Sequence, residues 1–352
     1  MSDWREKLIL WYNSNKRDLP WRGINDPYKI WLSEVILQQT RVNQGWEYYL
    51  RFIEKYPTIK ALAGAPQQDV LKLWQGLGYY SRARNLHEAA RFIVKEYRGK
   101  FPHEYDSIRK LKGVGDYTAG AIASIAYNLP FPAVDGNVMR VYSRLFGITT
   151  PIDSAQGKKE IYELGKDILV QATPGTYNQA VMELGAMVCA PAKPNCHACP
   201  IQAACYAYSH KMVMDLPVKQ GKTMQRNRYF HYLVITYNDK VLIRQRNKKD
   251  IWHGLHDFPA VETNKPVEAG KFMKDKMWKE LMPLWKPIMS DVSEEYVHIL
   301  SHQKLYARFY QIVVGRKITK LPEDCFWVKT DDLENYAVPK LIDLYIRKKF
   351  LK

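Results

Sequence analysis

The sequence predicts two domains of different fold class, an all-α domain over residues 1–210 and an α+β domain over residues 229–352, joined by a linker at 211–228. In the first part, apolar residues recur about every 3.6 positions between Pro and Gly residues, which is typical of helices. In the last part, β-branched and aromatic residues form short runs, which is typical of strands. With 352 residues and 46% hydrophobic composition, the chain can form more than one core.

The individual elements follow from the same patterns. Helices are expected at residues 30–39, 68–74, 119–126, 138–145 and 179–188. Strands are expected at 229–237 and 240–246, which flank the turn-forming pair Asn238-Asp239 and therefore predict a hairpin. The α+β domain is completed by strands at 296–300 and 305–314 and by helices near 271–284 and 340–350.

The chain is strongly basic, with 53 Lys and Arg residues against 36 Asp and Glu residues and a net charge of +17. This charge favours a polyanionic partner such as nucleic acid, although a basic enzyme without such a partner is an alternative. Charged residues interrupt the first twenty positions, and no apolar run reaches the length of a membrane helix. We therefore expect no signal or transit peptide, no membrane partner, and a cytoplasmic location, at the nucleoid if the source is bacterial.

Four of the five cysteines lie close together, separated by six, two and five residues: Cys189, Cys196, Cys199 and Cys205. Four thiolates from one short segment can bind zinc or an iron–sulfur cluster, because both take four soft anionic ligands. Zinc sites usually combine two Cys-x-x-Cys pairs, and only Cys196 and Cys199 are so close here. The spacing therefore favours a 4Fe–4S cluster, while a disulfide framework would suit a short exported chain better.

A glycine-flanked turn is expected between two helices at residues 111–119, where Gly113 and Gly115 occur. Glycine allows the backbone to approach a phosphate closely, and free amides at the start of the second helix favour its negative charge. The turn therefore predicts a DNA phosphate site, with a plain helix connection as the alternative.

Two carboxylates are candidate catalytic groups. Glu34 lies on the apolar helix stripe of Ile30 and Leu37, where burial is expected to raise its pKa and suit it to general acid catalysis. An ion pair with a nearby arginine such as Arg22 is the alternative. Asp135 precedes a predicted helix, where it can cap that helix or, while ionised, face a cationic transition state.

Several segments together resemble the MutY family of adenine DNA glycosylases, within the helix-hairpin-helix superfamily of base-excision enzymes. They are residues 31–40 (WLSEVILQQT), 75–86 (QGLGYYSRARNL), 113–115 (GVG), 134–140 (VDGNVMR) and the cysteine pattern. Endonuclease III-like lyases share the cysteine spacing, but they carry a Schiff-base lysine where this chain has Tyr117. The resemblance therefore implies a monofunctional glycosylase with a 4Fe–4S cluster that is not needed for the chemistry, and a monomer.

The implied substrate is double-stranded DNA in which adenine is paired with 8-oxoguanine or guanine and is flipped out for excision. By the resemblance, Glu34 is the proton donor, Asp135 stabilises the sugar cation, and Tyr117 and Asn137 orient the acids. The matching adenine-pocket residues are Arg22, Gln179 and Glu183. Those that enter the duplex or contact the lesion are Gln39, Thr40, Leu77 and Tyr79.

The C-terminal part resembles the family's Nudix-like lesion-recognition domain, whose signature matches residues 252–259 (WHGLHDFP). No Arg-Glu-x-x-Glu-Glu run follows, so no pyrophosphatase activity is expected. Ser301 and His302 match the loop that reads 8-oxoguanine, with Leu300 in place of the usual aromatic residue. Two rival functions stay open: a bifunctional lyase, and a cluster-bearing DNA sensor without catalytic activity.

Overall fold

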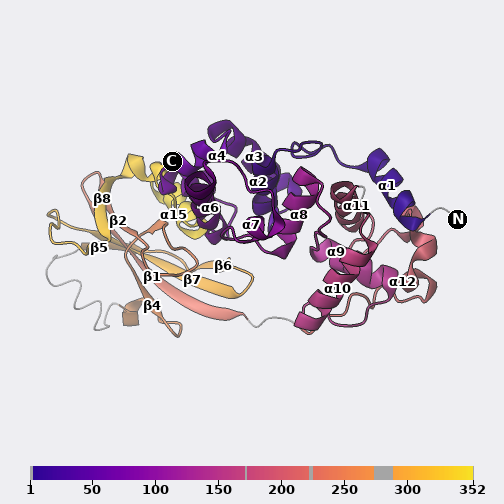
Figure 1. Cartoon of the computed structure of the whole chain (residues 1–352). Coiled ribbons are helices and arrows are strands. Elements are labelled where there is room, and N and C mark those ends of the chain that lie inside the picture. The colour runs from indigo at the N-terminus through magenta and orange to yellow at the C-terminus, as the bar shows by residue number, and fades with distance from the viewer. Residues whose placement is uncertain (1–2, 171–172, 222–224, 273–287, 352) are drawn as a thin grey trace. The chain divides into compact units, whose positions relative to one another are not determined.

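The computed structural model describes residues 3–170, 173–221, 225–272 and 288–351 (Figure 1). The chain forms two compact units. The first contains residues 1–65 and 85–221, and the second contains residues 66–84 and 222–352. A short segment from the N-terminal half of the sequence therefore folds with the C-terminal part.

The first unit is all-α, as predicted. Its helices are α1 (Trp4–Asn15), α2 (Pro27–Leu37), α3 (Val42–Lys55), α4 (Ile59–Gly64), α7 (Tyr105–Arg109), α8 (Asp116–Tyr127), α9 (Gly136–Phe146), α10 (Ala155–Ile168), α11 (Pro174–Met187) and α12 (Tyr206–Ser209). The helix α5 (Gln67–Leu73) belongs to the second unit, and α6 (Ser81–Tyr97) begins there and continues into the first. All five helices expected from apolar spacing are present, as α2, α5, α8, α9 and α11. None of the described helices could cross a membrane, because none is both long and apolar enough.

The helix α2 is the central element of the first unit. Asp26 caps its first turn by accepting the amides of Tyr28 and Lys29, and Pro27 occupies the position where a missing amide costs nothing. All residues of α2 from Ile30 to Ile36 are buried, so the helix lies inside the unit rather than on its surface. A polar side chain on α2 is therefore enclosed by protein.

Close packing of α11 brings it against the first turn of α9. A Cβ at Gly185 of α11 would lie 2.6 Å from the Cβ of Asn137 and 3.0 Å from its carbonyl oxygen. Only a glycine permits this approach without a shift of one helix. The contact therefore sets the distance between α11 and the residues that begin α9.

The second unit contains one mixed sheet, with the strand path β3-β2-β1-β7-β5 and with β4 on β1, β6 on β7 and β8 on β2. The strands are β1 (Arg226–Tyr237), β2 (Lys240–Gln245), β3 (His256–Asp257), β4 (Ala260–Thr263), β5 (Ile288–Val292), β6 (Tyr296–Ile299), β7 (Gln303–Val313) and β8 (Cys325–Lys329). The expected hairpin is formed by β1 and β2, with Asn238 at φ 51° in its turn. The strands β1 and β7 pair in parallel along their whole shared length.

Helices cover both faces of this sheet. On one face, Tyr345 of α15 (Lys340–Lys349) stacks on Phe309, with ring centroids 3.9 Å apart. On the other, Phe272 of α13 (Ala269–Phe272) stacks on His231 at 4.1 Å. The combination of a mixed sheet with helices confirms the α+β class. The start of the helix expected near 271–284 coincides with the end of α13, and residues 273–284 lie outside the described part of the chain.

The first half of the expected linker packs on the first unit. Leu216 is buried, and its carbonyl accepts a 2.9 Å hydrogen bond from Nε of Arg144. The amide of Gln220 donates to Asp153. Arg226 already belongs to β1, so the connection between the two units is shorter than the range 211–228.

Gly185→Ala is expected to lower the free energy of unfolding by about 1 to 3 kcal/mol, because the new methyl group would overlap Asn137. Chemical denaturation followed by circular dichroism measures the change. Gly64→Ala is the matched control, since a Cβ at Gly64 would meet no atom within 4 Å. Equal stabilities for the two variants would contradict the close approach of α11 and α9.

Candidate active site

A cavity of about 400 Å³ opens into the first unit between α2, α8, α11 and the start of α9. Its volume is in the range of small-molecule sites. It brings together residues from distant parts of the sequence that were all singled out as site candidates: Arg22, Glu34, Gln39, Thr40, Tyr117, Asp135, Asn137, Gln179 and Glu183. The two candidate carboxylates, about a hundred positions apart in the chain, therefore share one cavity.

Glu34 is a buried carboxyl group, and its residue is only 8% exposed. Burial raises its pKa to about 7, and the charge of Asp135 adds to the shift, while a hydrogen bond from Tyr117 and the charge of Arg22 oppose it. The Tyr117 hydroxyl donates to Oε2 of Glu34 at 2.5 Å. The carboxyl therefore stays protonated up to about neutral pH.

Asp135 occupies the N-cap of α9. Its Oδ1 accepts the amides of Asn137 and Val138 at 2.9 and 2.8 Å, and its Oδ2 accepts Nδ2 of Asn137 at 2.7 Å. Burial raises the pKa of Asp135 above its ordinary value, and these hydrogen bonds oppose the rise without cancelling it. The carboxylate of Asp135 thus both caps α9 and lines the cavity, and the amides at the start of α9 hold it in place.

Arg22 does not form the ion pair with Glu34 that was the alternative reading of that residue. Its guanidinium donates to Glu183 at 2.8 Å, to Gln179 at 2.7 Å and to the hydroxyl of Tyr12 at 2.7 Å. The side chain of Glu183 is fully buried. Although burial raises the pKa of Glu183, hydrogen bonds and charge from its arginine partners outweigh this, and its pKa is lowered.

Arg17 is a site residue that the sequence analysis missed. Its Nε and Nη2 donate to both carboxylate oxygens of Glu183 at 2.7 and 2.8 Å, and it lines the same cavity. Arg17 lies beyond the end of α1, outside any helix or strand, where no periodic pattern marks its direction. Only its pairing with a residue 166 positions away reveals it.

Gln39 holds a backbone conformation that side chains rarely adopt, with φ 57°, directly after the end of α2. Such a conformation costs on the order of 1 kcal/mol and persists only when its surroundings enforce it. Both Gln39 and the next residue, Thr40, line the cavity. The strained turn therefore presents two polar side chains at the cavity wall.

The glycine-flanked turn connects α7 and α8. Gly113 has φ 80°, which favours glycine, and Gly115 is the N-cap of α8. Because Gly115 has no side chain, it leaves the first amides of α8 without an N-cap side-chain bond. The nearby Asp116 is engaged by Nε of Arg109, which offsets its negative charge at this end of the helix.

The four clustered cysteines line one small cavity together with Arg144. Nη1 of Arg144 donates to Sγ of Cys189 at 3.3 Å. Burial raises the pKa of the thiols of Cys196, Cys199 and Cys205, that of Cys199 to about 11. Among the described residues, no three His, Cys, Asp or Glu side chains stand in the arrangement of ligands around a metal ion.

The remaining candidates lie in the second unit. Tyr79 is 43% exposed and has φ 46°, whereas Leu77 is buried at 6% exposure. Of these two residues, only Tyr79 is exposed enough for its side chain to contact a partner. Its hydroxyl forms a hydrogen bond with the hydroxyl of Ser301 in the turn between β6 and β7, and both Ser301 and His302 are exposed.

Comparison with known proteins identifies the family. Residues 32–167 match the model of the HhH-GPD superfamily base excision DNA repair protein, and residues 231–348 match that of the NUDIX domain. The adenine DNA glycosylase of Rattus norvegicus is 33% identical over 95% of this chain and 75% of its own. The adenine DNA glycosylase of Buchnera aphidicola subsp. Baizongia pistaciae is 31% identical over 97% of this chain and 95% of its own. The chain belongs to the adenine DNA glycosylase family.

Solved structures agree with this family assignment at the level of the fold. A thermostable thymine-DNA glycosylase is 29% identical, with a TM-score of 0.54 over 58% of this chain and 95% of its own. Endonuclease III in a non-covalent complex with DNA is 23% identical, with a TM-score of 0.50 over 59% of this chain and 94% of its own. Together with the NUDIX match, they confirm a helix-hairpin-helix unit followed by a Nudix-like unit in this adenine DNA glycosylase family member.

The buried acid predicts how stability depends on pH. The folded state keeps the Glu34 proton up to about pH 7, whereas the unfolded chain releases it near pH 4.5, so the free energy of unfolding falls as pH rises between these values. In Glu34→Gln the titrating carboxyl group is absent, so this fall in the free energy of unfolding should not occur. Relative to the natural protein, the variant should gain about 2 to 3 kcal/mol between pH 5 and pH 8, measured by urea denaturation.

Glu54→Gln serves as the control, because it removes a carboxyl group that is exposed on α3 and lies outside the cavity. A stability difference between Glu34→Gln and the natural protein that stays constant with pH would contradict the raised pKa.

Proposed function

We propose that this chain is a DNA glycosylase that hydrolyses the N-glycosidic bond of adenine paired with 8-oxoguanine or guanine in duplex DNA. The observation that carries the proposal is the shared cavity in which Glu34 and Asp135 have different surroundings. Adenine in a duplex is out of reach of such a cavity, so the nucleotide must first be flipped out of the helix. Membership of the adenine DNA glycosylase family supports the choice of base.

Glu34 is the general acid of this proposal. Its Oε2 accepts the Tyr117 hydroxyl, so the acidic proton is carried on Oε1 and is available to a ring nitrogen of the flipped adenine. Protonation turns the base into a neutral leaving group. With a pKa of about 7, the acid is present at physiological pH and still strong enough to give up its proton.

Asp135 supports the sugar as the base departs. Cleavage leaves an oxocarbenium-like cation, and three hydrogen bonds from Asn137 and Val138, together with the N-terminal end of α9, favour the ionised form of the carboxylate. An ionised group fixed by its surroundings stabilises a developing cation without reorganising. Water then completes the hydrolysis, and this division of labour parallels that of other glycosidases.

The chemistry is proposed to stop at base release. A lyase needs an amine that forms a Schiff base with the sugar. The hydroxyl of Tyr117 occupies the corresponding position, and the described residues that line the cavity include no lysine. Arg17 and Arg22 bind the buried Glu183, and Arg22 also binds Gln179. All four residues line the cavity and would contact the adenine or its sugar from there.

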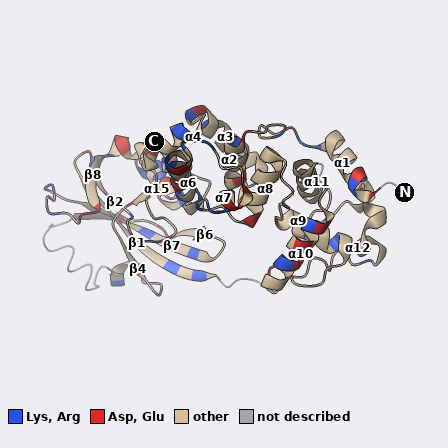
Figure 2. Ribbon diagram, viewed as in Figure 1, with Lys and Arg blue, Asp and Glu red and all other residues tan. Residues whose placement is uncertain are grey.

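The DNA contacts are assigned to features outside the acid pair. The amides at the start of α8, after Gly113 and Gly115, would bind a phosphate. Basic residues occur on both units, including β1 and β7 (Figure 2), and they would add sequence-independent attraction to the duplex. Gln39 and Tyr79, both in strained turns, would enter the space around the lesion. Ser301 and His302 would read the base opposite the adenine.

The four cysteines fit a 4Fe–4S cluster by the chemistry of the donor set. Four soft thiol groups line one cavity, and the guanidinium of Arg144 beside Cys189 would balance the negative charge that thiolate ligation brings. Cys189, Cys196, Cys199 and Cys205 would hold the cluster. When bound, it would tie together the segment that follows α11, and it takes no part in base release.

Glu34→Gln is expected to lower adenine excision by at least about 100-fold while leaving DNA affinity within about twofold, because the amide cannot donate an acidic proton. A duplex with one adenine opposite 8-oxoguanine, incubated with enzyme and then treated with alkali, reports base release. Strand cleavage only after alkali supports the monofunctional reaction, and cleavage without alkali indicates a lyase. Normal excision by Glu34→Gln would remove Glu34 from its assigned role.

The double variant Ser301→Ala, His302→Ala is expected to reduce the preference for adenine opposite 8-oxoguanine over adenine opposite guanine by about tenfold, because it removes polar contacts worth roughly 1 to 2 kcal/mol. Single-turnover excision rates on the two duplexes measure this ratio. Ser293→Ala is the control, since Ser293 bonds the backbone of Glu294 and Phe309, away from the turn. An unchanged ratio in the double variant would exclude the two residues from base reading.

A further inference from the structure

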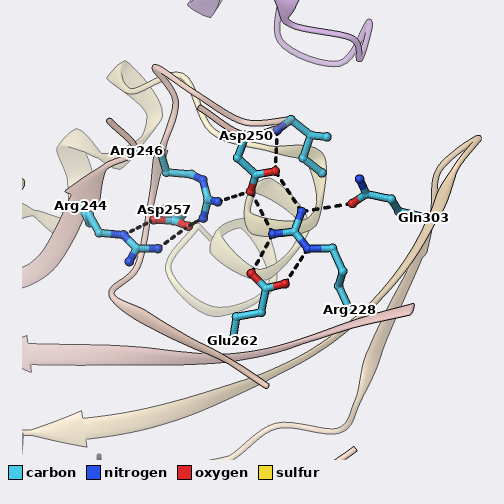
Figure 3. A network of polar contacts seen from close by, with 8 residues as sticks. Arg228, Arg244, Arg246, Asp250, Asp257, Glu262 and Gln303 are labelled. Atoms are coloured by element: carbon cyan, nitrogen blue, oxygen red, sulfur yellow. Dashed lines mark hydrogen bonds and ion pairs between the residues drawn. The ribbon is translucent and has the colours of Figure 1, made fainter. Parts of the chain in front are cut away.

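Three arginines and three carboxylates form a network in the second unit (Figure 3), and all of these side chains except the exposed Glu262 are buried or half-buried. We call this the arginine–carboxylate network; its members are Arg228, Arg244, Arg246, Asp250, Asp257 and Glu262. The side chain of Asp257 is fully buried, and those of Arg228 and Arg246 are 10% exposed. The charges balance, which is the condition under which buried ions are tolerated.

Arg228 lies at the centre of this network and uses all five of its N–H donors. Four of them reach carboxylate oxygens: Nε and Nη2 donate to Glu262 at 2.7 Å, and Nη1 and Nη2 donate to Asp250 at 3.0 Å. The fifth donates from Nη1 to Oε1 of Gln303 at 3.1 Å. Because two carboxylates hold the guanidinium plane, the position of this last donor is fixed.

Gln303 connects the network to the turn between β6 and β7. The backbone carbonyl of Gln303 accepts a hydrogen bond from the backbone amide of Leu300 at 2.8 Å. The backbone carbonyl of His302 accepts one from the backbone amide of Arg226 at 3.0 Å. Gln225 donates to the carbonyl of Leu300 at 3.1 Å. The backbone of the turn is therefore tied to β1 and β7, while the side chains of Ser301 and His302 remain exposed.

We propose that Arg228 and Gln303 are positioning residues that hold the turn at residues 300–302 so that Ser301 and His302 meet the base opposite the adenine. The inference rests on the proposed function, because it takes those two side chains as the readers of that base. Gln303 is the uncharged acceptor of Arg228, so its removal leaves every ion pair of the network in place. Its loss should therefore act on the turn more than on the stability of the unit.

The network also explains how an exposed turn can hold Ser301 and His302 in the fixed positions that reading one particular base requires. A turn at the end of a hairpin is normally the most mobile part of a sheet. Here its base is joined through Gln303 to an array in which Asp250 and Asp257 each bind two arginines. Holding the readers before DNA arrives reduces the ordering that binding would otherwise require.

The test compares Gln303→Leu with Gln311→Leu, which removes a glutamine from the same face of the same strand, eight positions further along β7. Single-turnover adenine excision is measured opposite 8-oxoguanine and opposite guanine, together with the melting temperature. Gln303→Leu should lower the ratio of the two rates about fivefold, whereas Gln311→Leu should leave it unchanged. Gln303→Glu, which keeps an acceptor oxygen toward Arg228, should retain most of the ratio.

Three outcomes would overturn the inference. An unchanged ratio in Gln303→Leu, with a lowered ratio in Ser301→Ala, His302→Ala, refutes the positioning role and leaves the proposed reading intact. An equal fall of both rates with a lower melting temperature in Gln303→Leu shows a merely structural role. An unchanged ratio in Ser301→Ala, His302→Ala removes the reading function and the positioning role together.

Discussion

The enclosure of the Glu34 carboxyl by protein is the constraint on which the candidate active site depends. The helix α2 is buried on nearly every side, so a carboxylate there is poorly solvated, and the pKa of Glu34 rises to about 7. Asp135 shares the cavity but receives three hydrogen bonds at the start of a helix. Two carboxyl groups of the same chemistry thus have different surroundings, which suits the buried Glu34 to donate a proton and the hydrogen-bonded Asp135 to stabilise a cation.

The helix α11 contributes a second buried glutamate, Glu183, to the same cavity. Glu183 is as deeply buried as Glu34, but Arg17 and Arg22 bind both of its oxygens. Its pKa is therefore lowered rather than raised. The contrast between the two glutamates shows that burial alone does not determine protonation. Whether a cation is paired with the carboxylate decides whether its pKa is raised or lowered.

The second unit uses buried charge for position rather than for acid–base chemistry. Replacing a balanced buried ion network with apolar side chains often costs little stability, so stability alone is a weak reason for such a network. What the arginine–carboxylate network provides is geometry: two carboxylates fix the guanidinium of Arg228, and that guanidinium fixes Gln303. The exposed Ser301 and His302 are two positions or fewer from this anchor.

Local patterns in the sequence were enough to predict the fold class, the five helices and the β1–β2 hairpin, because apolar spacing and turn residues act over short distances. They also placed Glu34 on an apolar stripe and Asp135 at a helix start. The extent of the helix near 271–284 stays a prediction. The strands β5 and β8, of five residues each, were not predicted, because they are defined by pairing with strands far away in the sequence.

By itself, the sequence determined which residue types could perform the chemistry and which helices carry them, since these properties depend on neighbours in the chain. Only the tertiary structure decided that Glu34 and Asp135 line the same cavity, that Arg17 pairs with Glu183, that residues 66–84 fold with the second unit, and that Arg228 holds Gln303. These arrangements join residues 75 to more than 160 positions apart, and no local periodicity encodes a contact over that distance.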